Sequence, residues 1–176
     1  HNKNSFAIIP GDSKYLSLIQ KKAKKKTSKV FTFGENKNCY SKFNINNDNK
    51  ISFTVSKQKI DLKKKISFKN WEINISIILV VLKILKLNLR KFKKNLEELK
   101  PLSGRGEIKK IIKDKKKFYL VDESYNSSPS ALITAIENLN EIKFKLNKKI
   151  LVIGDMLELG KLSKEMHQKI IPTIIG

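Results

Sequence analysis

The sequence predicts an α/β fold, in which strands and helices alternate along the chain. Apolar runs at 118–121 and 150–153 are each followed by a polar loop and then by apolar residues at helical spacing. Two further apolar runs, at 6–9 and 30–33, enclose another segment of helical spacing. Strands that alternate with helices are typical of parallel sheets with right-handed crossovers. We therefore expect an open parallel sheet to begin after residue 117.

The first half of the chain is expected to open with a strand, a helix and a strand, and to continue as a β-rich stretch. Pro10-Gly11 and Gly34 end the two apolar runs as turns, and apolar residues recur every three or four positions between them. The expected elements are a strand at 6–9, a helix at 15–23, a strand at 30–33, a loop or weak edge at 35–50, a strand at 51–55 and a continuing meander at 57–68.

Two helices are expected next, at about 71–87 and 89–99. The apolar stretch 73–87 has only 15 residues and contains Lys83 and Lys86, whereas a membrane span needs about 20 predominantly apolar residues. It therefore predicts a buried helix and no membrane span. In the second helix Leu89, Phe92, Leu96 and Leu99 share one face.

The best candidate for a domain boundary follows these helices. Pro101 ends the second helix, and Ser103-Gly104-Arg105-Gly106 forms a flexible joint, the only place where Pro and two Gly cluster. We expect one domain over 1–101 and a second over 102–176.

The net charge of +22 comes from 38 basic residues, of which only Arg90 and Arg105 are arginine. Proteins that read bases and phosphates rely on the arginine fork, and the lysines are spread over almost every segment. A solvated lysine surface is favoured, and a basic nucleic-acid-binding module is the alternative. The single Cys39 excludes an intrachain disulfide and fits a reducing, cytoplasmic compartment. No signal peptide or Cys/His zinc pattern is visible.

Two polar loops follow the predicted strands of the second half, at 122–130 and 154–160. Ligands of open parallel sheets lie beyond the carboxyl ends of the strands, so both loops are expected at one crevice. Asp122 could accept a hydrogen bond from a ribose hydroxyl or orient a water on magnesium, and Asn126 offers a donor and an acceptor. Alternatively, Asp122, Ser127 and Ser128 only cap the helix that begins at Pro129.

Arg105 is a further candidate, because it lies between two glycines in a chain that otherwise uses lysine. Glycines let a ligand approach the backbone, and a guanidinium binds phosphate through two parallel hydrogen bonds; a surface Arg in a turn is the alternative. His167, in a helix expected to be capped by Ser163, has no visible catalytic partner and favours a structural role. The chain contains no phosphate-binding GxxxxGK[ST] loop and no nucleophile elbow.

Two sequence motifs resemble the Mur ligase family. DESYNSSPSALITAIENL is similar to its Asp-Asp-x-Tyr-Asn-Ala-Asn-Pro-x-Ser loop and helix, and KKILVIGDMLELG, followed by His167, is similar to its Val-x-Gly-Asp-Met-x-Glu-Leu-Gly strand and turn. Upstream, 102–107 resembles the family's Gly-Arg-x-Glu segment and 70–74 its His-Trp-x-x-Asn helix start. AIIPGDSKY and VFTFG look like the end of the central ATPase domain.

The resemblance implies that residues 1–101 end a central ATP-binding domain and that 102–176 begin a Rossmann-like C-terminal domain. It implies ATP-dependent ligation of D-alanyl-D-alanine to UDP-N-acetylmuramoyl-tripeptide through an acyl phosphate, with ATP and Mg²⁺ as cofactors, in a monomer that binds no nucleic acid. On matching positions, ATP would contact Asn74, Arg105, Asp122, Tyr125, Asn126 and possibly Asn70.

The chain also departs from the family pattern. Glu123 replaces the second Asp, Ser128 replaces the Asn before Pro129, and Asn70 stands where the family has His. The phosphate loop and the main magnesium ligands would lie upstream, so no catalytic residue is assigned and the chain alone is expected to be inactive. A sister amino-acid ligase or a folylpolyglutamate synthase is the alternative within the superfamily; Tyr125-Asn126 and the Asp-Met-x-Glu-Leu-Gly residues argue against both.

Overall fold

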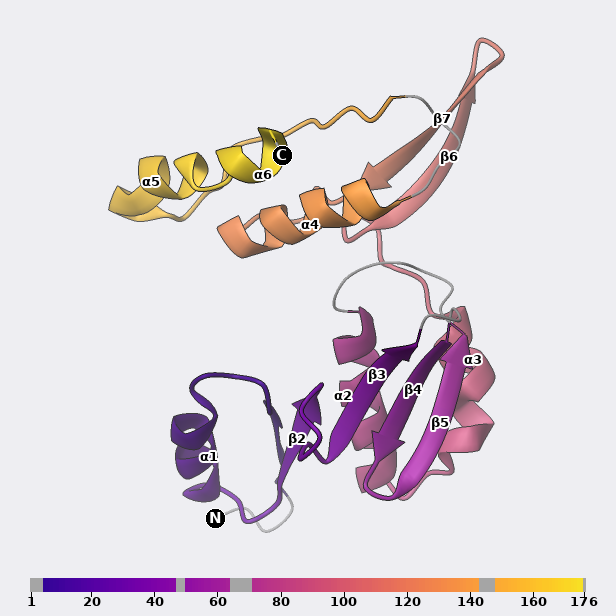
Figure 1. The fold of residues 1–176 in the computed structure, drawn as a ribbon, viewed down its shortest axis with the longest axis vertical. Helices are drawn as coiled ribbons and strands as arrows, with labels where there is room; N and C mark the ends of the chain where they lie inside the picture. Colours follow the sequence, from indigo (N-terminus) through magenta and orange to yellow (C-terminus); the bar gives the residue numbers. More distant parts are fainter. Residues whose placement is uncertain (1–4, 47–49, 64–70, 143–147, 176) are drawn as a thin grey trace. The chain divides into compact units, whose positions relative to one another are not determined.

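The computed structural model describes residues 5–46, 50–63, 71–142 and 148–175, and the chain forms two compact units (Figure 1). Residues 1–66 and 70–99 make up the first unit, and residues 67–69 and 100–176 the second. Both units combine helices with strands, which confirms the α/β class expected from the sequence. The assignment of 1–101 and 102–176 to two domains of a longer enzyme stays a prediction.

A five-stranded mixed sheet forms the first unit. Its strands lie in sequence order; β1, β2 and β3 are parallel, and β3, β4 and β5 are antiparallel. The strands are β1 (Ala7–Pro10), β2 (Val30–Gly34), β3 (Ser41–Asn46), β4 (Lys50–Val55) and β5 (Gln58–Lys63). The alternating burial of β4, with Ile51, Phe53 and Val55 inside, shows that one face of this sheet is covered.

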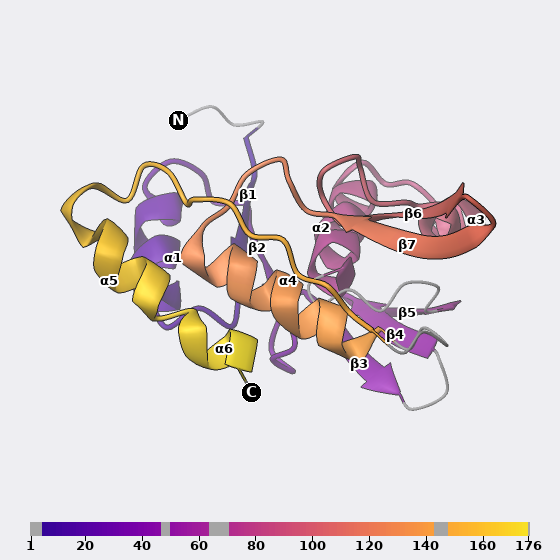
Figure 2. The same ribbon diagram turned by 90° about the horizontal axis from the view of Figure 1, so that it is seen from above.

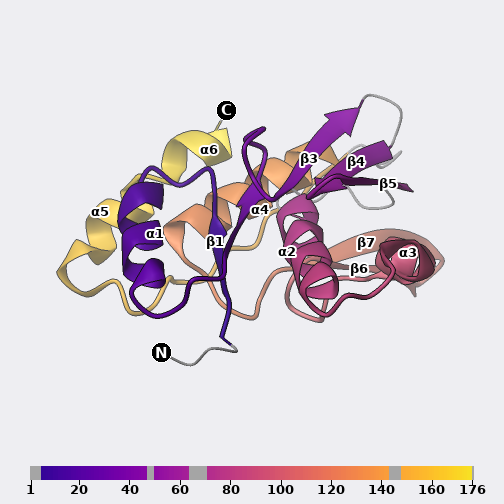
Figure 3. The same cartoon turned by 90° about the horizontal axis from the view of Figure 1, so that it is seen from below.

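Helix α2 (Trp71–Ile84) covers that face and completes the core. Leu79 and Val80 are fully buried, and the hydroxyls of Ser41 on β3 and Ser76 on α2, also fully buried, lie 2.7 Å apart. Among the described residues no helix is long and apolar enough to cross a membrane. Helix α1 (Leu16–Lys24) lies beside β1 and β2 and buries none of its residues fully (Figure 3).

Strand β3 corrects the expectation of a loop or weak edge over 35–50. The segment is rich in Lys and Asn, so its hydrophobic pattern is weak, yet β3 lies between β2 and β4. Phe43 is 6% exposed and pairs across the sheet with Phe53. Pairing with β4 decides its conformation, because strand preference depends on neighbouring strands more than on the segment alone.

The helix expected over 89–99 is shorter and begins differently. A 3-10 turn, η1 (Leu89–Phe92), precedes α3 (Lys93–Glu98), and the Asn88 side chain caps the turn by accepting a hydrogen bond from the Arg90 amide at 3.0 Å. Leu89 and Leu96 are buried as the shared face predicts, whereas Leu99 is exposed.

The second unit contains a hairpin and a group of helices. Strands β6 (Glu107–Lys113) and β7 (Lys116–Asp122) are antiparallel. Asp114 and Lys115, which join them, have φ of 49° and 60°, as two-residue hairpin turns require. The following helices are α4 (Pro129–Glu141), η2 (Gly160–Leu162), α5 (Ser163–Gln168) and α6 (Ile171–Ile175). Helix α6 lies beside α4 (Figure 2), and Ile136, Met156 and Ile170 form a small core.

This unit differs from the expected strand–helix–strand–helix order at two places. Strand β6 was not expected, and it pairs with β7 where a parallel neighbour was predicted. Residues 150–153 form no strand, and Ile150 and Val152 are 81% and 90% exposed. An apolar run becomes a strand only when another strand pairs with it, and no described strand does so here.

Candidate functional site

The turn at 102–106 and the loop after β7 lie side by side in the second unit. The Gly106 amide donates a hydrogen bond to the Asp122 carbonyl at 2.8 Å, and the Tyr125 amide donates to the Gly104 carbonyl at 3.1 Å. These two bonds extend the β6–β7 pairing beyond the hairpin. As a result, residues that are about 20 positions apart in the sequence become neighbours.

Gly104 makes this close approach possible. Its φ is +73°, a conformation that L side chains rarely adopt. A Cβ atom at this position would lie 3.0 Å from the Tyr125 Cβ and 3.1 Å from its amide nitrogen. Glycine is therefore needed here both for the backbone turn and for the contact with Tyr125.

Arg105, the next residue, stacks on Tyr125. The guanidinium carbon lies 4.1 Å from the centre of the ring, within the range of an attractive cation–π contact. Both residues are exposed, so the remaining N–H groups of the guanidinium can reach a ligand. The structure thus brings together two of the residues that the sequence singled out separately.

Asp122 lies at the end of β7, with a side chain that is 20% exposed. Its carboxylate accepts hydrogen bonds from the Ser124 hydroxyl at 2.6 Å and from the Ser124 amide at 3.2 Å. These two bonds, with the more distant charge of Lys109 at 3.9 Å, lower the pKa of Asp122 below its ordinary value. Asp122 is therefore an ionised acceptor, and it does not cap α4.

Ser128 caps α4 instead, as the sequence allowed. Its side chain accepts a hydrogen bond from the Ala131 amide at 3.3 Å, and Pro129 occupies the first turn. The Asn126 side chain is exposed, and its oxygen accepts a hydrogen bond from the Ser127 amide at 2.9 Å. The capping interpretation is thus correct for Ser128, while the Asn126 amide group keeps its two N–H donors toward solvent.

Two of the predicted nucleotide contacts are upstream of this cluster. Asn74 lies exposed in the first turns of α2, in the first unit. Asn70 lies outside the described residues. The cluster in the second unit therefore comprises Arg105, Asp122, Tyr125 and Asn126, which we name the hairpin-base site.

The loop 154–160 was expected to share a crevice with the loop 122–130. That expectation assumed a strand at 150–153, which is absent, so the two loops do not leave neighbouring strands of one sheet. Within the described residues no hydrogen bond joins them. The Met156 side chain of the loop 154–160 is buried instead with Ile136 of α4 and with Ile170. The Met156 amide also donates a hydrogen bond to His167 of α5.

His167 has the structural role that the sequence favoured. Its Nε2 accepts a hydrogen bond from the Met156 amide at 3.1 Å, so its Nδ1 carries the proton and donates to the Ser163 carbonyl at 2.8 Å. Ser163 is the first residue of α5 and Leu162 is the N-cap, which corrects the prediction of a Ser163 cap.

Lys109 was missed by the sequence interpretation. Its ammonium lies 3.1 Å from Glu107 and 3.9 Å from Asp122, and so places a positive charge beside the hairpin-base site. Strand alternation could have placed Lys109 on the same face as Glu107, but only if β6 had been recognised.

Several curated proteins are similar to this chain. No family model matches the chain. It is 34% identical over 174 residues to the UDP-N-acetylmuramoyl-tripeptide–D-alanyl-D-alanine ligase of Buchnera aphidicola subsp. Acyrthosiphon pisum, an alignment that covers 95% of this chain and 36% of the relative. It is 24% identical over 182 residues to the ligase of the same name from Rickettsia prowazekii, covering 99% of this chain and 38% of the relative.

Solved structures agree on the fold. A crystal structure of MurF from Acinetobacter baumannii superposes with a TM-score of 0.71 at 22% identity, covering 94% of this chain and 35% of that chain. A second crystal structure of the same protein gives a TM-score of 0.70. The chain thus spans somewhat more than a third of the proteins it matches. Along nearly all of its length, the chain therefore resembles one part of relatives that carry this name.

Proposed function

We propose that the chain is one part of an ATP-dependent ligase that joins D-alanyl-D-alanine to UDP-N-acetylmuramoyl-tripeptide in peptidoglycan precursor synthesis. The observation that carries this proposal is the 34% identity over 95% of the chain to a relative of that name. In this reaction the precursor carboxylate takes the terminal phosphoryl group of ATP. The dipeptide amine then displaces phosphate and forms the amide bond.

The role we assign to this chain is part of the nucleotide site. Arg105 supplies a guanidinium for phosphate or ribose oxygens, and ionised Asp122 accepts a hydrogen bond from a ribose hydroxyl. Tyr125 and Asn126 line the same surface, while Asn74, with Asn70, would face the adenine. The stacking of Arg105 on Tyr125 supports this role, because it orients the guanidinium before a ligand arrives. The two hydrogen bonds from Ser124 support it too, because they orient the Asp122 carboxylate and lower its pKa.

Magnesium would accompany ATP, but its ligands are not assigned to this chain. The described ranges contain no group of three or more His, Cys, Asp or Glu side chains that could hold a metal ion. Asp122 could accept a hydrogen bond from a water molecule bound to magnesium, without contacting the ion itself. The resemblance leads us to assign the main metal ligands to the remaining two thirds of the ligase. We also propose that this chain alone is inactive, and that the enzyme is a cytoplasmic monomer.

A chimeric ligase tests the proposal. This chain replaces the matching third of the Acinetobacter baumannii protein, and phosphate release that depends on D-alanyl-D-alanine is measured. We expect turnover by the chimera, a loss of about tenfold or more on Arg105→Met, and no turnover by this chain alone. A chimera that folds and still binds the UDP-precursor, yet releases no phosphate, would contradict the proposal.

A further inference from the structure

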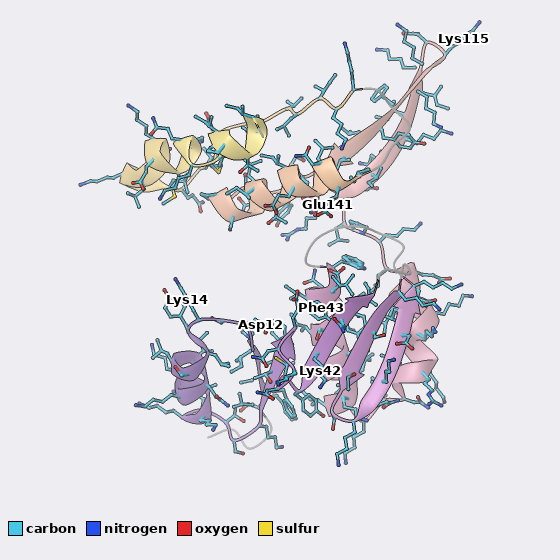
Figure 4. All side chains as sticks on the ribbon, in the orientation of Figure 1. Asp12, Lys14, Lys42, Phe43, Lys115 and Glu141 are labelled. Carbon is cyan, nitrogen blue, oxygen red and sulfur yellow. The ribbon has the colours of Figure 1, made fainter. Side chains whose placement is uncertain are left out.

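The end of the β6–β7 hairpin carries a dense cluster of lysines. Figure 4 shows Lys115 at the turn, with long side chains that end in nitrogen spreading from the hairpin. We call this surface the basic tip. It consists of seven exposed residues: Lys110, Ile112, Lys113, Lys115, Lys116, Lys117 and Phe118. Asp114 is the only acidic residue between Lys110 and Phe118. Within the described part of the chain, no carboxylate lies in ion-pair range of these five ammonium groups.

Two lysines of the tip repel each other across the hairpin. Lys113 and Lys116 are directly opposed across the strands, and like charges in that position destabilise a hairpin. One other such pair, Lys50 and Lys63, occurs in the first unit. The pair at the tip differs from it because three more lysines and two exposed apolar side chains surround it.

The apolar residues of the tip lie on both faces of the hairpin. Ile112 is 67% exposed and Phe118 is 43% exposed. Ile112 pairs with Lys117, while Phe118 pairs with Ile111, so strand alternation directs the two exposed side chains to opposite faces. A flat protein interface needs apolar groups on one face only. A tip that enters a layer of lipid headgroups contacts its surroundings on both faces.

We propose that the basic tip docks on a membrane surface rich in anionic phospholipid. The lysines complement the negative headgroups, and Ile112 and Phe118 enter the boundary between headgroups and acyl chains. Nucleic acid fits the tip less well, because the hairpin contains no arginine and because the tip offers a single aromatic ring, Phe118, whereas successive bases stack on several. This surface is independent of the hairpin-base site and of the ligase reaction.

Vesicle sedimentation with the full chain tests the proposal. The probes are vesicles of phosphatidylcholine alone and vesicles of phosphatidylcholine mixed with phosphatidylglycerol. Each is tested in about 0.1 M and about 1 M salt, because the Debye length falls from about 10 Å to 3 Å between these two concentrations. We expect binding to the mixed vesicles in the lower salt only. The variant K113Q/K116Q should lower the partition coefficient about 25-fold, since each lysine near an anionic surface contributes about fivefold.

The control is K50Q/K63Q, which removes an equivalent opposed pair and the same net charge from the first unit. It should change binding to the mixed vesicles less than twofold.

The variant K113Q/K116Q removes the repulsion between the two lysines, so it should fold at least as well as the original chain. Ile112→Ser should weaken vesicle binding without changing its salt dependence. Equal binding to neutral vesicles, equal losses in both glutamine variants, or preferential binding of a duplex oligonucleotide that competes with the vesicles would each overturn the proposal.

Discussion

Arg105 and Tyr125 form a stacked pair, with the guanidinium carbon 4.1 Å from the ring centre. The pair connects the turn before β6 with the loop after β7, and it orients the one arginine of the second unit. The Gly104–Tyr125 hydrogen bond holds the two segments together at the same place.

The stacked pair leads to a first prediction about nucleotide affinity. Tyr125→Leu should weaken ATP binding by the chimeric ligase about two- to fivefold, because an exposed cation–π contact contributes about 0.5–1 kcal/mol; Tyr125→Phe should keep most of the affinity. Calorimetric titration with a non-hydrolysable ATP analogue measures the effect. Tyr15→Leu is the control, since Tyr15 is also exposed and has Lys14 5.0 Å from its ring. An equal effect of both leucine variants would refute a local role for Tyr125.

Gly104 and Gly160 give a second prediction, about stability. Both have positive φ, but a Cβ at Gly104 would meet Tyr125 at 3.0 Å, whereas a Cβ at Gly160 meets nothing within 4 Å. Gly160→Ala should lower the free energy of unfolding by about 1–2 kcal/mol through backbone strain alone. Gly104→Ala should cost about 1 kcal/mol more, because Tyr125 must move. Urea unfolding of the two variants gives the difference, and equal losses would contradict the contact.

Asp122 gives a prediction about pH. Its pKa is lowered in the folded chain, chiefly by the Ser124 hydroxyl. The resulting contribution to stability is therefore fully present above the pKa of the unfolded chain and is lost as pH falls through the lower pKa of the folded chain. Asp122→Asn should flatten this part of the stability–pH profile, measured by urea unfolding.

Ser124→Ala should raise the pKa of Asp122, which carboxyl NMR can follow. Ser52→Ala is its matched control, because the Ser52 hydroxyl donates to Asp61 at the same distance of 2.6 Å and lowers the pKa of that carboxyl. A shift of the Asp122 resonance in the Ser52 variant, or none in the Ser124 variant, would show that the hydroxyl is not the cause.

His167 gives a prediction about the loop 154–160. His167→Ala removes the acceptor of the Met156 amide and the donor to the Ser163 carbonyl. The free energy of unfolding should fall by about 1–3 kcal/mol because these hydrogen bonds are lost. Hydrogen exchange at the Met156 amide should become faster. Ser163→Ala is the control, because it keeps the carbonyl that accepts from His167 and removes only the Ser163 hydroxyl, which lies 3.4 Å from His167 Nδ1. Unchanged protection of Met156 in the His167 variant would disprove the bridging role.

The buried Ser41–Ser76 contact gives a prediction about coupling. Ser76→Ala removes the hydroxyl that lies 2.7 Å from the buried Ser41 hydroxyl. It should lower the free energy of unfolding by about 1–3 kcal/mol. The double variant Ser41→Ala, Ser76→Ala should cost less than the sum of the single changes, because no unpaired hydroxyl remains. Urea unfolding of the three variants completes the cycle, and simple additivity would exclude coupling between β3 and α2.

The sequence by itself determined the elements that local chemistry specifies. The apolar runs at β1, β2 and β4 indicated strands, and the long apolar pattern of α2 indicated a buried helix. Ser128 before Pro129 identifies the start of α4. Arg105, Asp122 and Asn126 stood out as candidates because they lie in a turn, at a strand end and in a loop, whereas Tyr125 was named through the resemblance alone; their roles in binding stay predictions.

Only the tertiary structure decided which of these residues and elements meet. β3 and β6 are strands because β4 and β7 supply their hydrogen-bond partners. Residues 150–153, an apolar run, form no strand because none of the described strands pairs with them. The approach of Gly104 to Tyr125 and the bridge from His167 to Met156 depend in the same way on segments distant in sequence. Periodicity records which side of an element is apolar, whereas pairing and side-chain contacts depend on groups elsewhere in the chain.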